Sequence, residues 1–309
     1  MLPLVLALLL DRFFAEPRRW HPLVGFGRWA AWCKKRCYLA SRKAGLLAWL
    51  LAILPWVLLA GGLQISINFW DTSGWLLIVL QAIGLYLALG WKSLDQHLLS
   101  VDQALEQANL ALARQRVGYL VSRDTSELDA AGVRRAALES LLENGNDAIF
   151  GAIFWYLLLG LPGVVFYRLA NTLDALWGYR TPEYLYFGWA AARIDDLLNW
   201  LPARLTALSY SLLGLPRGHF LPSLQAAWKA SRTWKSSNAG AVMAAGAVVL
   251  QTRLGEAAVY QGVTEIRPLL GLAVHPSPSS SSLQAGLRLL WQAVFVWLIL
   301  IGLGGLLAC

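Results

Sequence analysis

Long runs of apolar residues alternate with short polar segments along this chain, and the lengths of the runs give the first expectation for its fold. The runs at about 44–65, 74–91 and 289–308 are close to the ~20 residues with which an α-helix crosses the hydrocarbon core of a bilayer. A further run at 148–166 contains a Leu-Pro-Gly sequence at 161–163, which is a strong helix breaker. The pattern predicts an all-α, polytopic integral membrane protein with about four or five spanning helices, together with amphipathic helices and one candidate re-entrant segment.

The charges around these runs predict an orientation. Basic residues cluster at 32–43, just before the first run, whereas the loop after that run carries Asp71 and few other charges. Cytoplasmic loops are enriched in Lys and Arg, so the basic cluster is expected in the cytoplasm and the Asp71 loop outside, with the chain back in the cytoplasm near Lys92. From Lys92 to Asp147, apolar residues recur at helical spacing among charged ones, which predicts water-facing amphipathic structure.

The same pattern predicts one membrane-embedded domain over 1–309. Its parts are a cytoplasm-facing polar region, a second polar region, a Ser/Pro linker and a C-terminal span, at about 92–147, 167–207, 275–282 and 289–308 respectively.

Composition narrows the class of protein. Apolar residues make up 57% of the chain and charged residues 14%, whereas a soluble protein carries about a quarter charged residues. The net charge of +8 is typical of positive-inside anchoring, and no basic stripe with interleaved aromatics predicts nucleic-acid binding. The three cysteines, Cys33, Cys37 and Cys309, form no CxxC pair and predict neither a disulfide framework nor a zinc site. Walker-type and GxGxxG motifs are absent, so a nucleotide would need an unconventional site.

A first polar face follows from a helix predicted to begin near Asp124 or Ser126. It carries Glu139, Glu143 and Asp147 at positions i, i+4 and i+8. Carboxylates at that spacing destabilise a bare helix, so the stripe is expected to meet Arg, Mg²⁺ or water. Mg²⁺ typically takes one or two carboxylates and keeps its other contacts for phosphates and water. An ordinary solvated face and, for Asp124 or Ser126, an N-cap role are the alternatives.

A second polar face lies at 190–201. On a helix the apolar side chains of this segment fall within one arc, and the opposite arc holds Arg193, Asp195, Asp196 and Asn199. The adjacent carboxylates repel each other unless Arg193, a divalent cation or a positively charged substrate offsets them. A structural ion pair between Arg193 and Asp196 is the alternative. Pro202 is expected to end this helix, which would place Arg204 just past it. Ionisable residues between membrane-length apolar runs are costly and are therefore functional candidates.

Four segments carry a resemblance to a known family: RDTSEL at 123–128, ESLLEN with a following Asp at 139–147, YRLANTLDALWGY at 167–179 and FGWAAARIDDLLNWLPARLTA at 187–207. Weaker similarities are Asp11, the EP and HPLVGFGR sequences within 16–28, and SSNAG at 236–240. With these segments the chain resembles the adenosylcobinamide-phosphate synthase family of cobalamin biosynthesis, the CobD/CbiB membrane proteins. Ser122, Ala152 and Ser237 depart from the usual residues of that family, and the tail after 255 follows it only loosely.

The resemblance implies an ATP-dependent ligase that forms an amide between the free carboxylate of adenosylcobyric acid and aminopropanol or its phosphate. Such a site needs Mg²⁺ and cationic side chains to neutralise the triphosphate, and a base to accept the proton of the amine. The candidate catalytic residues are Glu139, Glu143, Asp147 and Asp196. The candidate substrate-binding residues are Arg123, Asp124, Thr125, Asn144, Asn171, Asp174, Arg193, Asn199 and Arg204. The candidate Mg²⁺ ligands are Asp195, Asp196 and Glu143.

The implied partners are the corrinoid and amino-alcohol phosphate substrates and the lipid bilayer, with no nucleic acid. Homo-oligomerisation and contact with other cobalamin-pathway enzymes are both compatible with the sequence. Because ATP is cytoplasmic, the active site is expected on the cytoplasmic side of the inner cell membrane. Both polar faces should then share one side, so 148–166 is expected to be re-entrant or buried against other helices, with its bend at 161–163. A transporter, which would be expected to show internal repeats, and a non-catalytic membrane sensor on the same scaffold are the alternatives.

Overall fold

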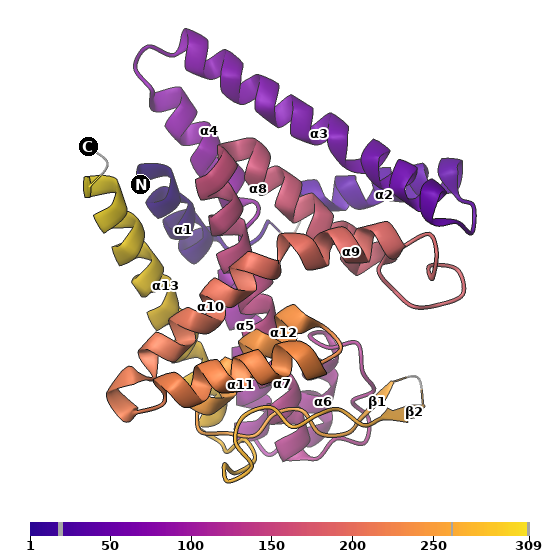
Figure 1. The fold of residues 1–309 in the computed structure, drawn as a ribbon, viewed down its shortest axis with the longest axis vertical. Helices are drawn as coiled ribbons and strands as arrows, with labels where there is room; N and C mark the ends of the chain where they lie inside the picture. Colours follow the sequence, from indigo (N-terminus) through magenta and orange to yellow (C-terminus); the bar gives the residue numbers. More distant parts are fainter. Residues whose placement is uncertain (18–20, 261, 308–309) are drawn as a thin grey trace. The chain divides into compact units, whose positions relative to one another are not determined.

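Helices account for nearly all of the regular structure (Figure 1). The computed structural model describes residues 1–17, 21–260 and 262–307, so Cys309 lies outside the described residues. The chain divides into two compact units, of which the first is Met1–Lys92 with Asp147–Asn199 and the second is Ser93–Asn146 with Trp200–Cys309. A single domain over the whole chain stays a prediction.

The first unit contains the helices α1 (Leu2–Phe14), α2 (Pro22–Cys37), α3 (Arg42–Trp70), α4 (Trp75–Tyr86), α8 (Gly151–Trp177) and α9 (Trp189–Leu198). The second contains most of α5 (Trp91–Glu106) and α6 (Leu110–Gly118), α7 (Ala130–Gly145), α10 (Trp200–Leu213), α11 (Phe220–Thr233), α12 (Ser237–Val249) and α13 (Ser282–Leu307). A π-helical turn, η1 (Asn146–Phe150), and a 3-10 turn, η2 (Leu215–Arg217), complete the helical elements. Strands β1 (Ala258–Tyr260) and β2 (Val263–Glu265) pair as an antiparallel hairpin.

Four helical stretches are long and apolar enough to cross a membrane. They are Arg42–Trp70, Trp75–Glu106, Ala130–Trp177 and Ser282–Gly305. They contain all four apolar runs found in the sequence. The prediction of an all-α, polytopic membrane protein is confirmed.

Side-chain caps begin the first two of these stretches. Ser41 Oγ accepts a hydrogen bond from the Ala44 backbone N–H at 3.3 Å, where α3 starts. Asp71 lies in the turn between α3 and α4, as expected, and its Oδ2 accepts the Leu76 backbone N–H at 2.7 Å. A carboxylate is favoured at a helix N-terminus because it satisfies backbone donors that have no partner within the helix.

Helix α8 is broken in its middle, next to the Leu-Pro-Gly sequence. Gly160 has φ 66° and ψ −143°, a conformation that only glycine adopts readily. The freed backbone N–H of Leu161 donates to Oε1 of Gln64 on α3 at 2.8 Å. An unsatisfied backbone group is costly in lipid, so this bond makes the break tolerable. Helix α8 packs against α3 and α4, but Leu157, Leu158 and Leu159 are exposed, so the segment 148–166 is only partly buried against other helices. Its re-entry into the bilayer stays a prediction.

In the second unit, α12 is the buried helix. Every residue from Asn238 to Val249 is buried, and α10 and α11 pack against it. Figure 1 shows α11 and α12 lying side by side. A helix that is apolar all round is expected in a core, and the small Ala and Gly side chains of α12 allow close approach of its neighbours.

Two local expectations were wrong. Helix α9 ends at Leu198 and not at Pro202, which occupies the third position of α10. A proline is tolerated there because the backbone N–H groups of a first helical turn need no partner within the helix, and Arg204 consequently lies inside α10. The N-cap of α7 is Asp129, whose Oδ1 accepts the Gly132 N–H at 2.7 Å, rather than Asp124 or Ser126.

Candidate functional site

The first unit buries a carboxylate between two amide side chains. Asp195, near the end of α9, is 8% exposed. Its Oδ1 accepts a hydrogen bond from Asn171 Nδ2 on α8 at 3.2 Å, and its Oδ2 accepts one from Asn199 Nδ2 at 3.1 Å. We call these three residues, with Tyr167 and Asp174 of α8 and Asp147 of η1, the Asp195 cluster. The cluster therefore brings three predicted residues of the second polar region, Asn171, Asp174 and Asn199, together with Asp195. It also includes Asp147, a predicted residue of the first polar region.

Tyr167 fixes the orientation of one of these amides. Its hydroxyl lies 2.8 Å from Asn199 Oδ1 and 3.0 Å from the backbone oxygen of Asp147, and its single hydrogen can be donated to either. With the oxygen of Asn199 turned toward Tyr167, the NH₂ group faces Asp195. Gly151 makes this placement possible, because a Cβ at that position would lie 2.1 Å from the Tyr167 hydroxyl.

The surroundings of Asp195 disfavour the charged form of its carboxylate. Burial raises the pKa of Asp195 well above its usual value, and the nearby Asp147 and Asp174 carboxylates raise it further, while the two amides act in the opposite direction. No ion pair to Asp195 occurs within residues 1–17, 21–260 and 262–307. A proton, a metal cation or a cationic substrate group would relieve this repulsion.

The neighbouring residue points outward. The Asp196 side chain is 49% exposed, and its Oδ2 lies 3.8 Å from Arg193 Nη1, whose side chain is 65% exposed. Partial burial raises the pKa of Asp196, and Arg193 and Arg180 offset part of the effect. Asp195 and Asp196 thus differ in their surroundings: the first is enclosed by amides and the second is accessible from solvent.

The second unit holds a carboxylate that is fully neutralised. Glu139 of α7 is 4% exposed, and its Oε2 lies 2.7 Å from Arg123 Nη2 and 3.1 Å from Arg267 Nη1. Its Oε1 accepts the Gly255 backbone N–H at 2.7 Å. The Arg267 guanidinium also lies over the Trp234 ring at 5.3 Å. We call Arg123, Glu139 and Arg267 the Glu139 network.

Arg204 has a separate environment in the same unit. It donates to the Asn238 Oδ1 of α12 and to the Trp200 backbone oxygen, the latter at 3.1 Å, and its guanidinium lies 5.0 Å from the centre of the Trp200 ring. Burial lowers the pKa of Arg204. These contacts position the guanidinium between α10 and α12.

The other predicted residues make local contacts. The backbone N–H of Ser126 donates to Asp124 Oδ1 at 2.9 Å and is the main reason that the pKa of the exposed Asp124 is lowered. Thr125 Oγ1 donates to the Arg114 backbone oxygen at 3.1 Å. Asn144 Nδ2 donates to the Ser140 backbone oxygen at 2.9 Å, and Glu143 lies half-buried on the same helix. Asp124, Thr125 and Asn144 thus each bond to a different neighbour.

Sequence reasoning missed Tyr167 and Arg267. Tyr167 is the first residue of the YRLANTLDALWGY segment. The sequence signal that could have identified it was a polar hydroxyl group within an apolar stretch. Arg267 stands in the weakly matching tail, and nothing in its local pattern points to a partner 128 residues away.

A metal was predicted at Asp195, Asp196 and Glu143. The residues that the structure describes contain no group of three or more His, Cys, Asp or Glu side chains arranged to hold an ion. A magnesium ion held by one or two carboxylates and by ligand phosphates needs no such group, so the prediction stays open to test.

The fold and these clusters define a multi-pass α-helical membrane protein with buried ionisable groups. Residues 4–290 match the family model described as CobD/Cbib protein, and the chain belongs to this family. It is 49% identical to Cobalamin biosynthesis protein CobD of Stutzerimonas stutzeri, over 97% of this chain and 96% of that protein. The same name belongs to relatives from Chromobacterium violaceum, 48% identical over 95% of this chain and 93% of the relative, and from Mycobacterium tuberculosis, 37% identical over 85% and 83%. No solved structure matches the chain.

Proposed function

We propose that this protein is an ATP-dependent ligase of cobalamin biosynthesis. It would join the free carboxylate of adenosylcobyric acid to the amine of aminopropanol or its phosphate. The observation that carries the proposal is the match of residues 4–290 to the CobD/CbiB family, with relatives named for cobalamin biosynthesis along nearly their whole length. The Asp195 cluster supports it, since enclosed carboxylates and amides suit a charged, amide-rich substrate.

The reaction has two steps. An oxygen of the substrate carboxylate attacks the γ-phosphorus of ATP, the bond to the bridging oxygen breaks, and ADP leaves, which gives an acyl phosphate. The amine nitrogen then attacks the carbonyl carbon, the bond to the phosphate oxygen breaks, and inorganic phosphate leaves. The attacking nitrogen loses one proton, so the site needs a base within hydrogen-bond reach of it.

Asp196 is our candidate for that base. Its carboxylate is accessible from solvent, and its raised pKa brings it closer to the range in which a general base works well. Arg193, 3.8 Å away, is placed to hold the carboxylate or a substrate phosphate. The adjacent Asp195 would keep Asn171 and Asn199 in position, since both amides donate to it.

Magnesium fits the donor chemistry of this region. Asp195 and Asp196 offer hard oxygen ligands, and a cation would offset both the burial and the neighbouring carboxylates that raise the pKa of Asp195. When bound, Mg²⁺ would neutralise the triphosphate and the charge that develops on transfer. The role of Glu143 as a further ligand stays a prediction. The proposal places the site at the cytoplasmic side of the inner membrane, where ATP is available.

The test uses the full-length protein purified in detergent, with adenosylcobyric acid, aminopropanol phosphate, ATP and Mg²⁺. Corrinoid product is followed by mass and ADP release in the same samples. We expect product only when all four components are present, and the same assay with aminopropanol decides which amine is preferred. A folded sample that yields neither product nor ADP would contradict the proposal and favour a transporter or a non-catalytic sensor.

A further inference from the structure

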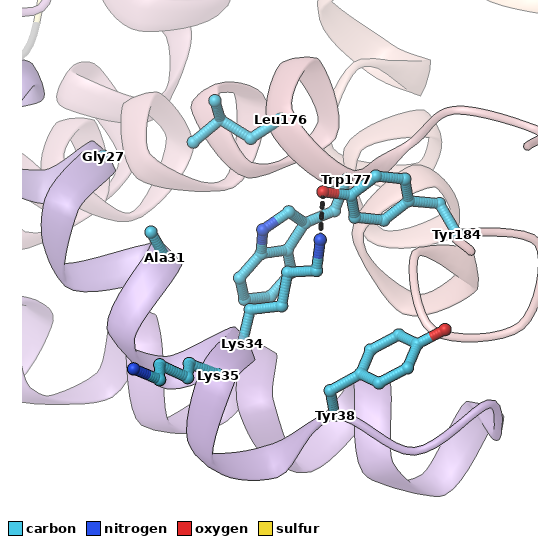
Figure 2. Close-up of a pocket in the computed structure, with 8 residues that line it drawn as sticks. All are labelled: Gly27, Ala31, Lys34, Lys35, Tyr38, Leu176, Trp177 and Tyr184. Atoms are coloured by element: carbon cyan, nitrogen blue, oxygen red, sulfur yellow. Dashed lines mark hydrogen bonds between the residues drawn. The ribbon is translucent and has the colours of Figure 1, made fainter.

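A basic and aromatic pocket lies in the first unit, apart from the carboxylates described above. It has a volume of about 370 Å³, within the range of small-molecule sites. One wall is the face of α2 that carries Gly27, Ala31, Lys34 and Lys35, and the opposite wall is formed by the end of α8 and Tyr184 of the following loop (Figure 2). The pocket is open enough for a solute or a lipid headgroup to enter.

Lys34 is fixed at one side of the pocket. Its ammonium lies 2.7 Å from Glu183 Oε1 and 2.5 Å from the Tyr184 hydroxyl, and its side chain is 21% exposed. Figure 2 shows the ammonium pointing at that hydroxyl. An ammonium group has three N–H donors, so one remains for an additional acceptor. The lysine is therefore already positioned to bind an anion.

Lys35 adds a second, uncompensated charge. It is exposed, and the described part of the chain gives it neither an ion pair nor a hydrogen bond. In Figure 2 the Lys35 side chain extends away from the Lys34 ammonium and from the Trp177 ring. With Glu183 balancing Lys34, the pocket carries a net positive charge.

The remaining surface is aromatic and small. Trp177, the last residue of α8, is 2% exposed and backs the pocket from within the core, while Tyr38 and Tyr184 contribute phenol rings to its surface. On α2, Gly27 leaves open space, because a Cβ there would have no atom within 4 Å. A planar or apolar group can lie in this space while an anionic group reaches the lysines.

Basic residues are common in the last turn of a helix, where they offset the helix dipole, and at cytoplasmic membrane boundaries. That explanation covers Lys34, Lys35 and Arg36 equally. It does not explain why only the two lysines line a cavity with aromatic walls, whereas Arg36 lies over the Trp32 ring instead.

We propose that the pocket between α2 and the end of α8 binds the phosphate group of a ligand whose planar or apolar part lies against α2 at Gly27 and Ala31. Two sources share this chemistry: a nucleoside triphosphate from solution and the headgroup of an anionic phospholipid. For the nucleotide the inference rests on the proposed function, which names ATP as co-substrate, and the two remain distinguishable because phosphate binding is measured without turnover.

The test compares matched variants of the full-length protein in two binding assays. Gly27→Leu fills the pocket, and Gly25→Leu is its control, since both glycines lie on α2 with open space at Cβ but only Gly27 lines the pocket. Lys35→Ala removes a charge from the pocket, and Arg36→Ala removes one from the same turn outside it. Radiolabelled ATP binding is measured by equilibrium dialysis on protein in phosphatidylcholine nanodiscs. Retention of phosphatidylglycerol is measured by native mass spectrometry of detergent-solubilised protein.

We expect Gly27→Leu and Lys35→Ala to weaken one of the two ligands about tenfold, as loss of a charge-assisted contact does, and the two controls to leave both unchanged. Weaker ATP binding identifies the nucleotide as the source, and weaker phosphatidylglycerol retention identifies the lipid. If all four variants bind both probes like the unmodified protein, or if the controls weaken binding as much as the pocket variants, the proposal is wrong. Circular dichroism before each assay verifies that the variants are folded.

Discussion

Glu139 and Asp195 are both buried carboxylates in an apolar protein, yet their surroundings are opposite. Glu139 receives two guanidinium groups and a backbone N–H. Within the described part of the chain, Asp195 accepts hydrogen bonds from two side-chain amides and is close enough to two further carboxylates for their charges to raise its pKa. A buried charge is expensive unless it is paired, so the first arrangement is complete within the protein and the second is not.

The difference separates a structural role from a chemical one. The Glu139 network joins α7, the segment before it and the segment after α12, and every group on Glu139 already has a partner. Its prediction as a catalytic residue stays untested, but the geometry favours a role in holding Arg123 and Arg267. The Asp195 cluster, by contrast, has a lower electrostatic energy when a proton, a cation or a cationic substrate group binds. Perturbed groups of that kind gather at functional sites.

The largest effect is expected from Glu139→Ala. The change leaves two buried guanidinium groups without their carboxylate and should lower the free energy of unfolding by about 3–5 kcal/mol. Denaturant titration in detergent, followed by tryptophan fluorescence, measures it. A double-mutant cycle with Arg267→Ala should give a combined loss smaller than the sum of the two single losses. Additive losses would show that the two side chains do not act as one unit.

A smaller effect, confined to turnover, is expected from Asp196→Asn. If this carboxylate is the base, its loss should reduce kcat about a hundredfold or more in the four-component assay, equivalent to roughly 2.7 kcal/mol. Thermal stability should hardly change, because the side chain is half exposed. Glu106→Gln, an exposed carboxylate on α5, serves as the control. Unchanged turnover in Asp196→Asn would remove this residue from the proposed mechanism.

The pH dependence of stability should distinguish the Asp195 cluster from an ordinary surface. An aspartate in the unfolded chain titrates near pH 3.9, whereas burial moves the pKa of Asp195 upward in the folded protein. Between those two values the folded state binds more protons than the unfolded state, so the free energy of unfolding falls as the pH rises and then levels off. Asp195→Asn should reduce that fall.

Thermal midpoints of both proteins, measured in steps from pH 4 upward, provide the measurement. The variant should be the more stable of the two at the upper end of the range, since it has no charge to bury. Parallel curves for the two proteins would contradict the assigned shift.

The smallest effect is expected from Glu256→Gln. Glu256 pairs with Arg135 at 2.7 Å, close to the Glu139 network, but its side chain is 36% exposed. An ion pair in contact with water contributes about 0–1 kcal/mol. The loss in free energy of unfolding should therefore be far below that of Glu139→Ala. A loss as large as that of Glu139→Ala would mean that burial does not explain why Glu139 and Glu256 differ in their contribution to stability.

Some of these features follow directly from the sequence. The spanning helices were predicted because apolar length alone sets the ability to cross a bilayer, and the break in α8 because Pro and Gly disfavour a continuous helix. Asn171, Asp195 and Asn199 were recognised as candidates from their polarity within apolar surroundings. The hydrogen bond from Asn171 to Asp195 was not predictable, because the pattern along one helix does not specify what faces it from another.

The failures have physical reasons as well. Pro202 was assigned to a helix end by its local preference, but the same preference allows it in a first turn, and the local sequence does not decide between the two. Arg267 was missed because its partner, Glu139, is distant in sequence and the segment between α12 and α13 has no repeating pattern. Contacts of this kind depend on the folded chain rather than on any window of it.

The bond between Gln64 and Leu161 has a consequence for how this chain can vary. It makes the break in α8 depend on a side chain that stands 97 residues earlier in the chain. A substitution of Gln64 by an apolar residue removes the acceptor for an amide that the helix itself cannot satisfy, so such a change should be accepted only in chains that have also lost the break at Gly160. Positions 64 and 160 should therefore change together across natural sequences, and a library that varies both should recover them as a linked pair.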